Sequence, residues 1–302
     1  MVGVGPFRGV RRARAFAPGH VTGFFVPALD ATDPRARGST GAGLVLDRGV
    51  RAAARFDPSG RTVLRVRSRP RVPLPISRDV ARRLRADQPG SLEVDLVHDL
   101  PVGQGLGMSA AGAVATGLAV AAVLGRPTRA AWETAHLAEL YLRGGLGGVA
   151  ALAGGGLEHR WRAGVPPFGR VRHRPCVAPI ALYVAGPPIP SPSILSAPDR
   201  LRRIRQVGGR CEAEFVRHPT AAVFFGQAER FTDAVGLAPS GVLRAIEALR
   251  AAGYLAMQAM FGQVVLATPG PGVRRSGWPN LPGVKRLPGV RIGTTGAGLL
   301  PP

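Results

Sequence analysis

The sequence predicts an α+β fold in two parts, and three observations lead to that prediction. Each half of the chain shows strands, then helices, then strands again, an order that favours segregated α+β layers over one doubly wound sheet. The chain has 302 residues, of which 45% are hydrophobic, so it can bury more than one minimal core. A glycine-rich loop joins a strand to a helix in the first half, and such a junction can bind an anion.

The expected elements of the first half follow from hydrophobic periodicity and from turn residues. Alternation with period two predicts strands, because successive side chains of a strand face opposite sides of the sheet. Ser91–His98 is the clearest case. In chain order the expected strands are 15–25 (broken by a turn at Pro18-Gly19-His20), 41–50, 61–72, 91–98 and 159–162. The expected helices are 78–86, 109–124 and 129–143, with a short helical turn inside the glycine-dense stretch 144–156.

The second half is expected to begin in the proline-rich stretch 166–179, which marks a domain boundary. Its expected strands are 180–184, 264–267 and 290–294, and its expected helices are 199–217, 219–235 and 240–252. The predicted division of the chain is a basic N-terminal extension over 1–14, a first domain over 15–170 and a second domain over 171–302.

The formal charge of +22, with a pI near 11.8, would suit a protein that binds a polyanion. Lys285 is the only lysine, however, and arginines are spread along the whole chain while aromatics make up only 6% of it. A GC-rich genome produces such an arginine bias, with abundant Ala, Gly and Pro, without selection for binding. We therefore favour composition bias and do not expect nucleic acid as a partner, with functional polyanion binding as the open alternative. The positive electrostatic field of the protein would still attract phosphorylated substrates.

Cysteine usage and hydropathy bear on the cellular location. Cys176 and Cys211 form neither a CxxC pair nor a zinc-binding spacing, so a reducing cytoplasm is expected. The longest apolar run, Ala110–Leu124, is too short and too weakly hydrophobic to span a bilayer. The N-terminus has arginines without the apolar stretch of a secretory signal. The sequence thus predicts a cytoplasmic protein that does not enter a membrane.

The strongest local signal is the segment PVGQGLGMSAAGA, from Pro101 to Ala113. Its three alternate glycines, 103, 105 and 107, allow positive φ angles and a close approach of the backbone to a ligand. The helix that follows offers free backbone N–H groups and the positive end of its dipole. The segment therefore predicts an anion cradle for nucleotide phosphates. Ser109 is placed to cap the helix, or to face a phosphate or its Mg²⁺.

Three other kinds of segment have similar glycine spacing. A glycine-rich turn with an ordinary serine N-cap would have a similar sequence. No GK[ST] follows, so the segment is not a P-loop. A dinucleotide fingerprint needs a βαβ unit with an acid about 20 residues further on, whereas the next acid downstream is Glu133. The glycine pattern by itself therefore favours an ordinary turn, and phosphate binding needs further support.

The loop resembles the phosphate-binding loop of GHMP kinases, Pro-x-x-x-Gly-Leu-Gly-Ser-Ser-Ala. Met108 replaces the first serine, a departure that fits the archaeal pantoate kinase branch of the superfamily. More segments resemble that branch in family order, namely AFAPGHVTGFF at 15–25, AHLAELYLRGGLGGV at 135–149 and GGGLEHRWRAGVPPFG at 154–169. AMQAMFGQVVLA at 256–267 resembles the third glycine motif of the superfamily more weakly. The resemblance covers most of the first domain.

The resemblance implies a fold and an activity. The first domain would be the ATP-binding domain, with a left-handed β-α-β connection like that of ribosomal protein S5 domain 2, and the second would be ferredoxin-like. ATP would lie in the cleft between them. The implied reaction is the ATP- and Mg²⁺-dependent phosphorylation of (R)-pantoate to 4-phosphopantoate in coenzyme A biosynthesis. Family members commonly dimerise, which implies a homodimer.

The resemblance also assigns roles to individual residues. Ser109 and Glu139 would be the catalytic pair and hold Mg²⁺, whereas His20 and Arg160 would bind pantoate. An arginine fork suits a planar carboxylate. The ATP-binding residues would be Pro101, Gly103, Gly105, Leu106, Gly107, Met108, Ser109 and Ala110. The structural alternatives are a surface turn histidine at 20 and a surface Glu139–Arg143 helical pair.

One position departs from the family. Where the family stretch TGLGDV has an aspartate that orients or deprotonates the attacking hydroxyl, this sequence has Gly148. General-base help is worth roughly 10²–10⁴ in rate, but phosphoryl transfer depends mostly on positioning and electrostatic stabilisation. We therefore expect a slower kinase rather than an inactive one. The alternatives are a kinase for another small alcohol (homoserine-, shikimate- or mevalonate-like) and a catalytically weakened nucleotide-binding paralogue.

Overall fold

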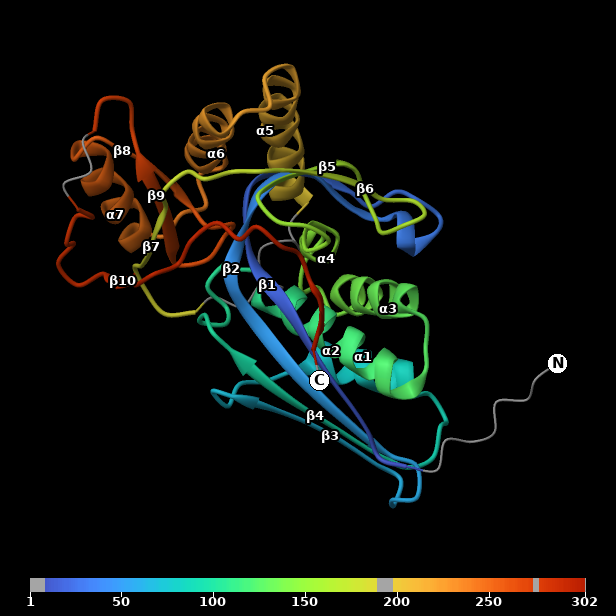
Figure 1. The fold of residues 1–302 in the computed structure, drawn as a ribbon. Coiled ribbons are helices and arrows are strands. Elements are labelled where there is room, and N and C mark those ends of the chain that lie inside the picture. The colour runs from blue at the N-terminus through green and yellow to red at the C-terminus, as the bar shows by residue number, and fades with distance from the viewer. Residues whose placement is uncertain (1–8, 189–197, 274–276, 302) are drawn as a thin grey trace.

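The computed structural model describes residues 9–188, 198–273 and 277–301 (Figure 1). A seven-stranded sheet has the order β11-β1-β2-β4-β3, with β5 paired to β2 and β6 paired to β5. Its strands are β1 (Arg11–Ala28), β2 (Gly38–Asp57), β3 (Val63–Arg69), β4 (Ser91–His98), β5 (Leu157–Arg162), β6 (Arg170–Arg174) and β11 (Gly298–Leu300). A second, four-stranded sheet has the order β10-β7-β9-β8. Its strands are β7 (Ala181–Val184), β8 (Tyr254–Gln258), β9 (Val264–Pro269) and β10 (Lys285–Leu287).

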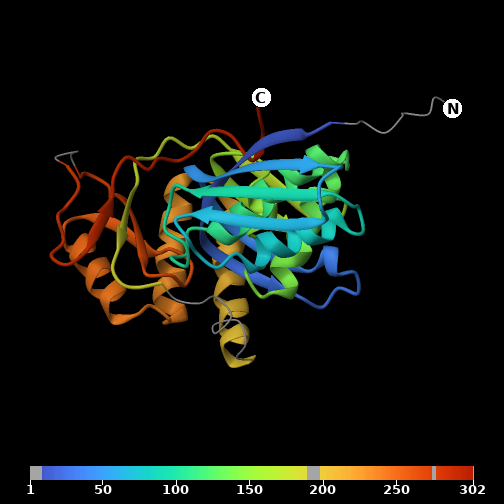
Figure 2. The ribbon, with the colours of Figure 1, turned by 90° about the horizontal axis from the view of Figure 1, so that it is seen from below.

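Helices cover one face of the first sheet and leave the opposite face open, as Figure 2 shows. The covering helices are α1 (Pro75–Arg85), α2 (Met108–Leu124), α3 (Thr128–Tyr141) and the short α4 (Gly148–Ala151). α2 lies at the centre, packed on β1, β2, α1 and α3. Its small and apolar residues are buried on all sides, as expected of a helix that lacks a polar face. The remaining helices are α5 (Pro198–Arg217), α6 (Ala221–Val235) and α7 (Ser240–Ala251), with a 3₁₀ turn at Pro34–Ala36.

An aromatic cluster joins the two parts of the molecule. Phe24 of β1 lies 5.6 Å from Phe215 of α5 between ring centroids, and Phe25 lies 5.7 Å from Phe231 of α6. Phe261, beyond β8, completes the contact at 5.9 Å from Phe25. Edge-on ring contacts at such separations are favourable. One continuous core therefore runs from the first sheet to α5 and α6, with a smaller core between α7 and the second sheet.

The α+β fold class is confirmed, and most helices and strands lie near their predicted positions. The predicted turn at Pro18-Gly19-His20 is wrong, because β1 runs unbroken through it and only a register shift against β2 marks the place. A bulge, rather than a turn, lets the strand stay paired on both sides. Arg11–Arg14, the end of the predicted basic extension, is also paired strand, whereas residues 1–8 lie outside the described residues.

The closing strand predicted at 290–294 is also wrong. Only a single bridge, between Leu46 and Ile292, forms there, and the strand is β11, which pairs with β1. β6 belongs to the first sheet, so the chain leaves that sheet only after Arg174 and returns to it at 298–300. The domain limits at 170 and 171 thus stay a prediction, although the change of sheet comes slightly later.

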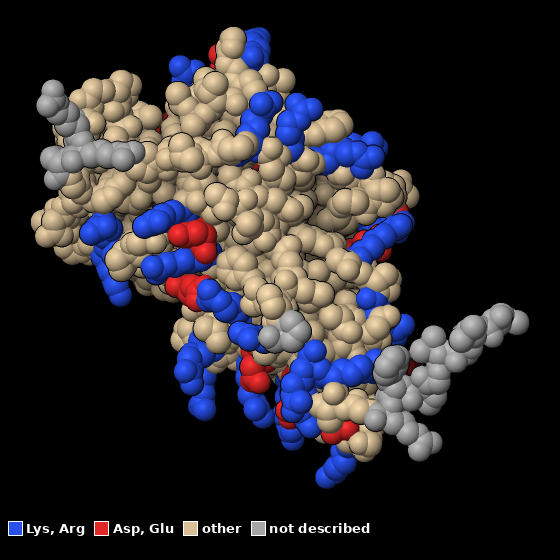
Figure 3. Space-filling model, viewed as in Figure 1, with Lys and Arg blue, Asp and Glu red and all other residues tan. Residues whose placement is uncertain are grey.

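Charged side chains lie in several separate groups on the face drawn in Figure 3, with acidic residues among the arginines. On the open sheet face Arg51 pairs with Asp99 at 2.7 Å, and Arg65 pairs with Glu93 at 2.8 Å. Within the described part of the chain, none of the helices has both the length and the apolar character needed to cross a membrane.

Candidate active site

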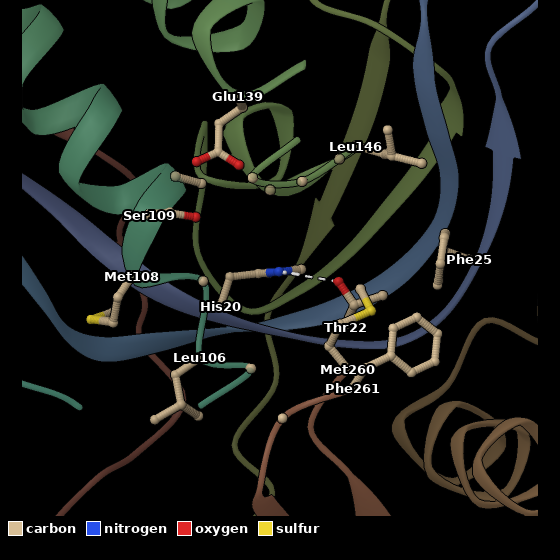
Figure 4. Close-up of a pocket in the computed structure, with 18 of the residues that line it drawn as sticks. His20, Thr22, Phe25, Leu106, Met108, Ser109, Glu139, Leu146, Met260 and Phe261 are labelled. Carbon is tan, nitrogen blue, oxygen red and sulfur yellow. Dashed lines mark hydrogen bonds between the residues drawn. The ribbon is translucent and has the colours of Figure 1, made fainter. Parts of the chain in front are cut away.

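A cavity of about 230 Å³ lies where the two parts of the molecule meet (Figure 4). The glycine loop and the start of α2 form one wall, together with Glu139 of α3. His20, Thr22 and Phe25 of β1 form another. Ser39 of β2, the loop before α4 and the turn between β8 and β9 close the cavity, so five segments that are distant in sequence contribute to it.

The backbone of the glycine loop depends on its glycines. Gly103, Gly105 and Gly107 have φ angles of +75°, +81° and +66°, which favour glycine. A Cβ atom at Gly105 would lie 1.9 Å from the carbonyl oxygen of Ala259, so only glycine allows the loop to pack on the β8–β9 turn. Gly107 is the N-cap of α2 and provides no side-chain cap. The N–H groups of the first helical turn therefore remain available for an anion.

Ser109 and Glu139 form a buried pair beside this helix end. The serine hydroxyl donates to the carboxylate, so the alternative of a serine N-cap is wrong. Glu139 is only 3% exposed, which also excludes a solvated surface carboxylate. Burial raises the pKa of Glu139 to about 7, against the opposing effect of the Ser109 hydrogen bond. Its Oε1 atom is buried without a hydrogen-bond partner.

These two side chains fit a magnesium ion. Mg²⁺ is usually held by one or two carboxylates together with water and substrate phosphates, and the unused oxygen of Glu139 needs a partner. No group of three His, Cys, Asp or Glu side chains that could hold a metal occurs among the described residues. Glu139 and Ser109 would therefore hold the ion jointly with the phosphates. The ion would neutralise charge on the transferred group.

A second polar network lies behind β1. Nε2 of His20 donates to Oε1 of Glu158 at 2.9 Å, and the Arg160 guanidinium donates to the same oxygen. All three side chains are buried, with Glu158 fully so. Burial lowers the pKa of His20, and this outweighs the opposite effect of Glu158. Burial would raise the pKa of Glu158, but Arg160 and the bond to His20 hold it below its ordinary value.

Arg160 does not reach the cavity wall, and neither does Pro101. The guanidinium lies behind Gly147, where an added Cβ would come within 2.6 Å of Nε of Arg160 and 2.5 Å of Oγ of Ser39. The remaining predicted residues, His20, Gly103, Gly105, Leu106, Gly107, Met108, Ser109, Ala110 and Glu139, all line the cavity. Their predicted roles stay predictions.

Glu158 is the residue that the sequence reasoning missed. It lies two positions before Arg160 on β5, so both side chains face the same side of the strand. That spacing was a usable signal, because a carboxylate and an arginine on one buried face of a strand must pair. Thr22, whose Oγ1 lies 3.4 Å from Nδ1 of His20, was also missed.

The loop and the β1 bulge are directly connected. The backbone N–H of His20 donates to the carbonyl of Leu106 at 3.0 Å. Met108 is buried, and its methyl group lies 2.9 Å from the place where a Cβ of Gly19 would stand. Methionine at 108 thus fills the space beneath the bulge.

Gly148 begins α4 and lines the cavity. A Cβ added at Gly148 would lie 2.9 Å from Cβ of Ala110, in the first turn of α2. A side chain at this position would therefore start beside the N-terminus of α2, and the neighbouring alanine would have to shift to admit it.

Known proteins share both the sequence and this architecture. Residues 76–156 match the family model of the GHMP kinases N terminal domain. The pantoate kinase of Methanospirillum hungatei is 34% identical over 202 residues, which are 65% of this chain and 68% of that protein. The pantoate kinase of Thermococcus kodakarensis is 31% identical over 75% of this chain and 77% of its own. The chain belongs to the pantoate kinase family of GHMP kinases.

Solved structures agree with this family membership. A protein described as a phosphotransferase related to the coenzyme A biosynthesis pathway superposes with a TM-score of 0.79 at 26% identity, covering 96% of this chain and 98% of its own. A homoserine kinase from Cytophaga hutchinsonii has a TM-score of 0.61 at 16% identity, which shows a shared fold only, and covers 96% of this chain and 97% of its own. The predicted membership of the GHMP superfamily is confirmed, and so is the predicted fold class.

Proposed function

We propose that this chain transfers the γ-phosphoryl group of ATP to the primary hydroxyl of (R)-pantoate, giving 4-phosphopantoate for coenzyme A synthesis. The observation that carries the proposal is the buried Ser109–Glu139 pair at the open end of α2, in a chain whose relatives are named pantoate kinases. We call the glycine loop with Ser109 and Glu139 the donor side. We call His20 and Thr22, with Glu158 and Arg160 behind them, the acceptor side.

The donor side suits ATP with Mg²⁺. The described cavity wall contains neither arginine nor lysine, so backbone N–H groups and the helix end would bind the phosphates. Glu139 would bring the ion beside them. Catalysis by such a site rests on positioning and on neutralising charge, which is what phosphoryl transfer mainly requires.

The acceptor side suits a small branched hydroxy acid. Phe25, Leu146, Met260 and Phe261 give the cavity apolar surface for the methyl groups of pantoate. Arg160 lies directly behind Gly147, and we propose that its guanidinium attracts the pantoate carboxylate from there. His20 would contact the substrate hydroxyl groups from β1.

The test is whether the purified protein phosphorylates pantoate directly. The chain is incubated with Mg²⁺-ATP and (R)-pantoate at several temperatures, while ADP release is followed by a coupled assay and phosphopantoate by mass spectrometry. Homoserine, shikimate and mevalonate serve as control acceptors. We expect product with pantoate and not with the control acceptors.

Two results would overturn the proposal. Product with a control acceptor alone would assign a different small alcohol to the same site. Mg²⁺-ATP binding without turnover on any acceptor would favour a nucleotide-binding paralogue with weakened catalysis, the alternative that Gly148 supports.

A further inference from the structure

The reaction proposed above leaves one proton without an acceptor, and the inference that follows rests on that proposed function. Glu139 is the only carboxylate on the described cavity wall, and in the proposed function it would hold the magnesium ion. Position 148, where the resemblance described above implies an aspartate, is glycine. The proton of the acceptor hydroxyl then goes to another group on the wall, to water or to an oxygen of the transferred phosphoryl group.

His20 lies beside the same helix end as Gly148. A Cβ at Gly107 would come within 3.2 Å of Cβ of His20, and a Cβ at Gly148 would come within 2.9 Å of Cβ of Ala110. Gly107 and Ala110 are about one helical turn apart. His20 and Gly148 thus flank the first turn of α2, where the phosphates are expected, and both line the cavity.

Gly43 of β2 allows the side chain of His20 to reach the carboxylate of Glu158 on β5, which orients the imidazole ring. In the sheet Gly43 of β2 is paired with Thr22 of β1 on one side and with Glu158 of β5 on the other. A Cβ at Gly43 would lie 2.3 Å from Nε2 of His20. The missing side chain therefore opens the path over β2 along which His20 reaches Glu158.

The hydrogen-bond network assigns the tautomer of His20. An ionised carboxylate only accepts, so Nε2 carries the hydrogen that Glu158 binds, and Nδ1 keeps its lone pair. Nδ1 lies on the side of Thr22, which lines the cavity, as the dashed line in Figure 4 shows. The separation of 3.4 Å leaves this lone pair only weakly engaged.

The charges around His20 favour a neutral base. The charged and titratable groups that act on His20 are Glu158, Arg160 and His173. Burial, with Arg160 and His173, lowers its pKa, so the ring is neutral at neutral pH and can take a proton. Once His20 is protonated, the carboxylate of Glu158 stabilises the imidazolium, as the acid of a catalytic triad does.

We propose that His20, oriented by Glu158, accepts the proton of the acceptor hydroxyl in place of the aspartate that the family has at position 148. The substrate O–H bond breaks and its proton goes to Nδ1, directly or through the hydroxyl of Thr22. The oxygen forms the new bond to the γ-phosphorus, and the bond from phosphorus to ADP breaks with its electron pair on ADP. The imidazolium then returns the proton to water. His20 is a catalytic residue in this scheme, and Glu158 is a positioning residue.

The first experiment is a pH profile of kcat for pantoate phosphorylation, measured with saturating Mg²⁺-ATP. For the wild type we expect an acidic limb with a pKa below the ordinary histidine value of 6.5, unmoved by more Mg²⁺. His20→Gln should lower kcat by about 100-fold or more and abolish this limb. Glu158→Gln should shift the limb to lower pH, because the carboxylate raises the pKa of His20. A purely structural role for Glu158 would lower activity without moving the limb.

The second experiment is a rescue. In the His20→Gln background, Gly148→Asp is combined with Ala110→Gly, which removes the methyl group that a side chain at 148 would meet. We expect kcat to rise at least about tenfold above that of His20→Gln, since a carboxylate again takes the proton. Ala110→Gly without Gly148→Asp should not rescue. His218→Gln, on an exposed turn, is the control for loss of a histidine.

The outcomes separate the two proposals. If the wild type phosphorylates pantoate, but His20→Gln keeps kcat within about threefold and retains the acidic limb, the inference is overturned and the proposed function stands. If the wild type binds Mg²⁺-ATP but forms no phosphopantoate, the proposed function fails and the inference falls with it. Circular dichroism and Mg²⁺-ATP titration check the fold of each variant. If His20→Gln does not fold, the inference is tested by whether Glu158→Gln shifts the acidic limb of the pH profile of kcat.

Discussion

The donor side and the acceptor side handle buried polarity in opposite ways. The donor side has small side chains, free N–H groups at the end of α2 and one carboxylate with an unused oxygen. The acceptor side has side chains that bind one another, with His20 and Arg160 both donating to Glu158. The first arrangement leaves its carboxylate without a counter-charge, whereas the second carries its own counter-charges, although Oε2 of Glu158 and Nε of Arg160 also lack hydrogen-bond partners.

The carboxylates of the two sides have pKa values shifted in opposite directions. Burial raises the pKa of a carboxylate that has no fixed counter-ion, as it does for Glu139, and a metal ion would lower this pKa again. A carboxylate paired with a buried arginine has a lowered pKa, as Glu158 has. The charge state of the donor side should therefore respond strongly to Mg²⁺ and pH. The geometry of the acceptor side should depend mainly on how its side chains pack.

The largest effect is expected from Glu139→Gln. The amide keeps the shape and the contact with Ser109 but loses the charge that would hold Mg²⁺. We expect kcat to fall by about 10² to 10³, because a metal ion contributes several kcal/mol of charge stabilisation. Glu133→Gln, on the same helix but paired with Arg129 at the surface, is the matched control. Activity within a few-fold of the wild type would show that the donor side does not need this carboxylate.

The same variant should have the opposite effect on stability when no Mg²⁺ is present. Because the folded pKa of Glu139 is about 7 and the ordinary value is 4.5, the folded state holds the proton more tightly. The stabilisation that protonated Glu139 gives to the folded state is fully present below pH 4.5. It is lost, by about 3 kcal/mol, as the pH rises to 7. Urea unfolding in EDTA should therefore find Glu139→Gln more stable than the wild type at pH 8, and equal to it near pH 4.5. An equal difference at both pH values would contradict this account.

A smaller effect is expected from Gly147→Ala on the acceptor side. The new methyl group would lie 2.5 Å from Oγ of Ser39 and 2.6 Å from Nε of Arg160, which must move. Overpacking of this kind costs about 1–3 kcal/mol, so we expect KM for pantoate to rise about tenfold while KM for ATP changes little. Gly209→Ala in α5, where a Cβ meets open space, is the control. A rise in KM for ATP alone would place the pantoate carboxylate elsewhere.

The donor side was largely predictable from the sequence. Alternate glycines between Ser91–His98 and a helix of small residues predict a phosphate loop by local rules alone, and the structure has this loop. The position of Ser109 in the first turn of α2 follows from the same local rules. Burial of Glu139 does not, because its helix has both exposed and buried faces and only packing decides which side is covered.

The acceptor side could not be predicted in the same way. His20 and Glu158 are 138 positions apart and meet because β2 lies between their strands with Gly43 at the crossing point. Strand register is set by pairing along the whole sheet, and a shift by one residue would turn every side chain to the other face. The bulge at Pro18-Gly19-His20 was missed for the same reason, since a turn and a bulge share the same residues.

The sequence by itself determined the local features of this protein: where most helices and strands lie, which glycines have positive φ, and that the N-terminus of α2 has no side-chain cap. These features depend on interactions between near neighbours in the chain, whereas the two elements predicted wrongly, at 18–20 and 290–294, depend on pairing with distant strands. The tertiary structure alone decided that Glu139 is buried with a raised pKa and that His20, Glu158 and Arg160 form one network. Desolvation and charge pairing come from side chains on other elements, and the three-dimensional packing of those elements sets both.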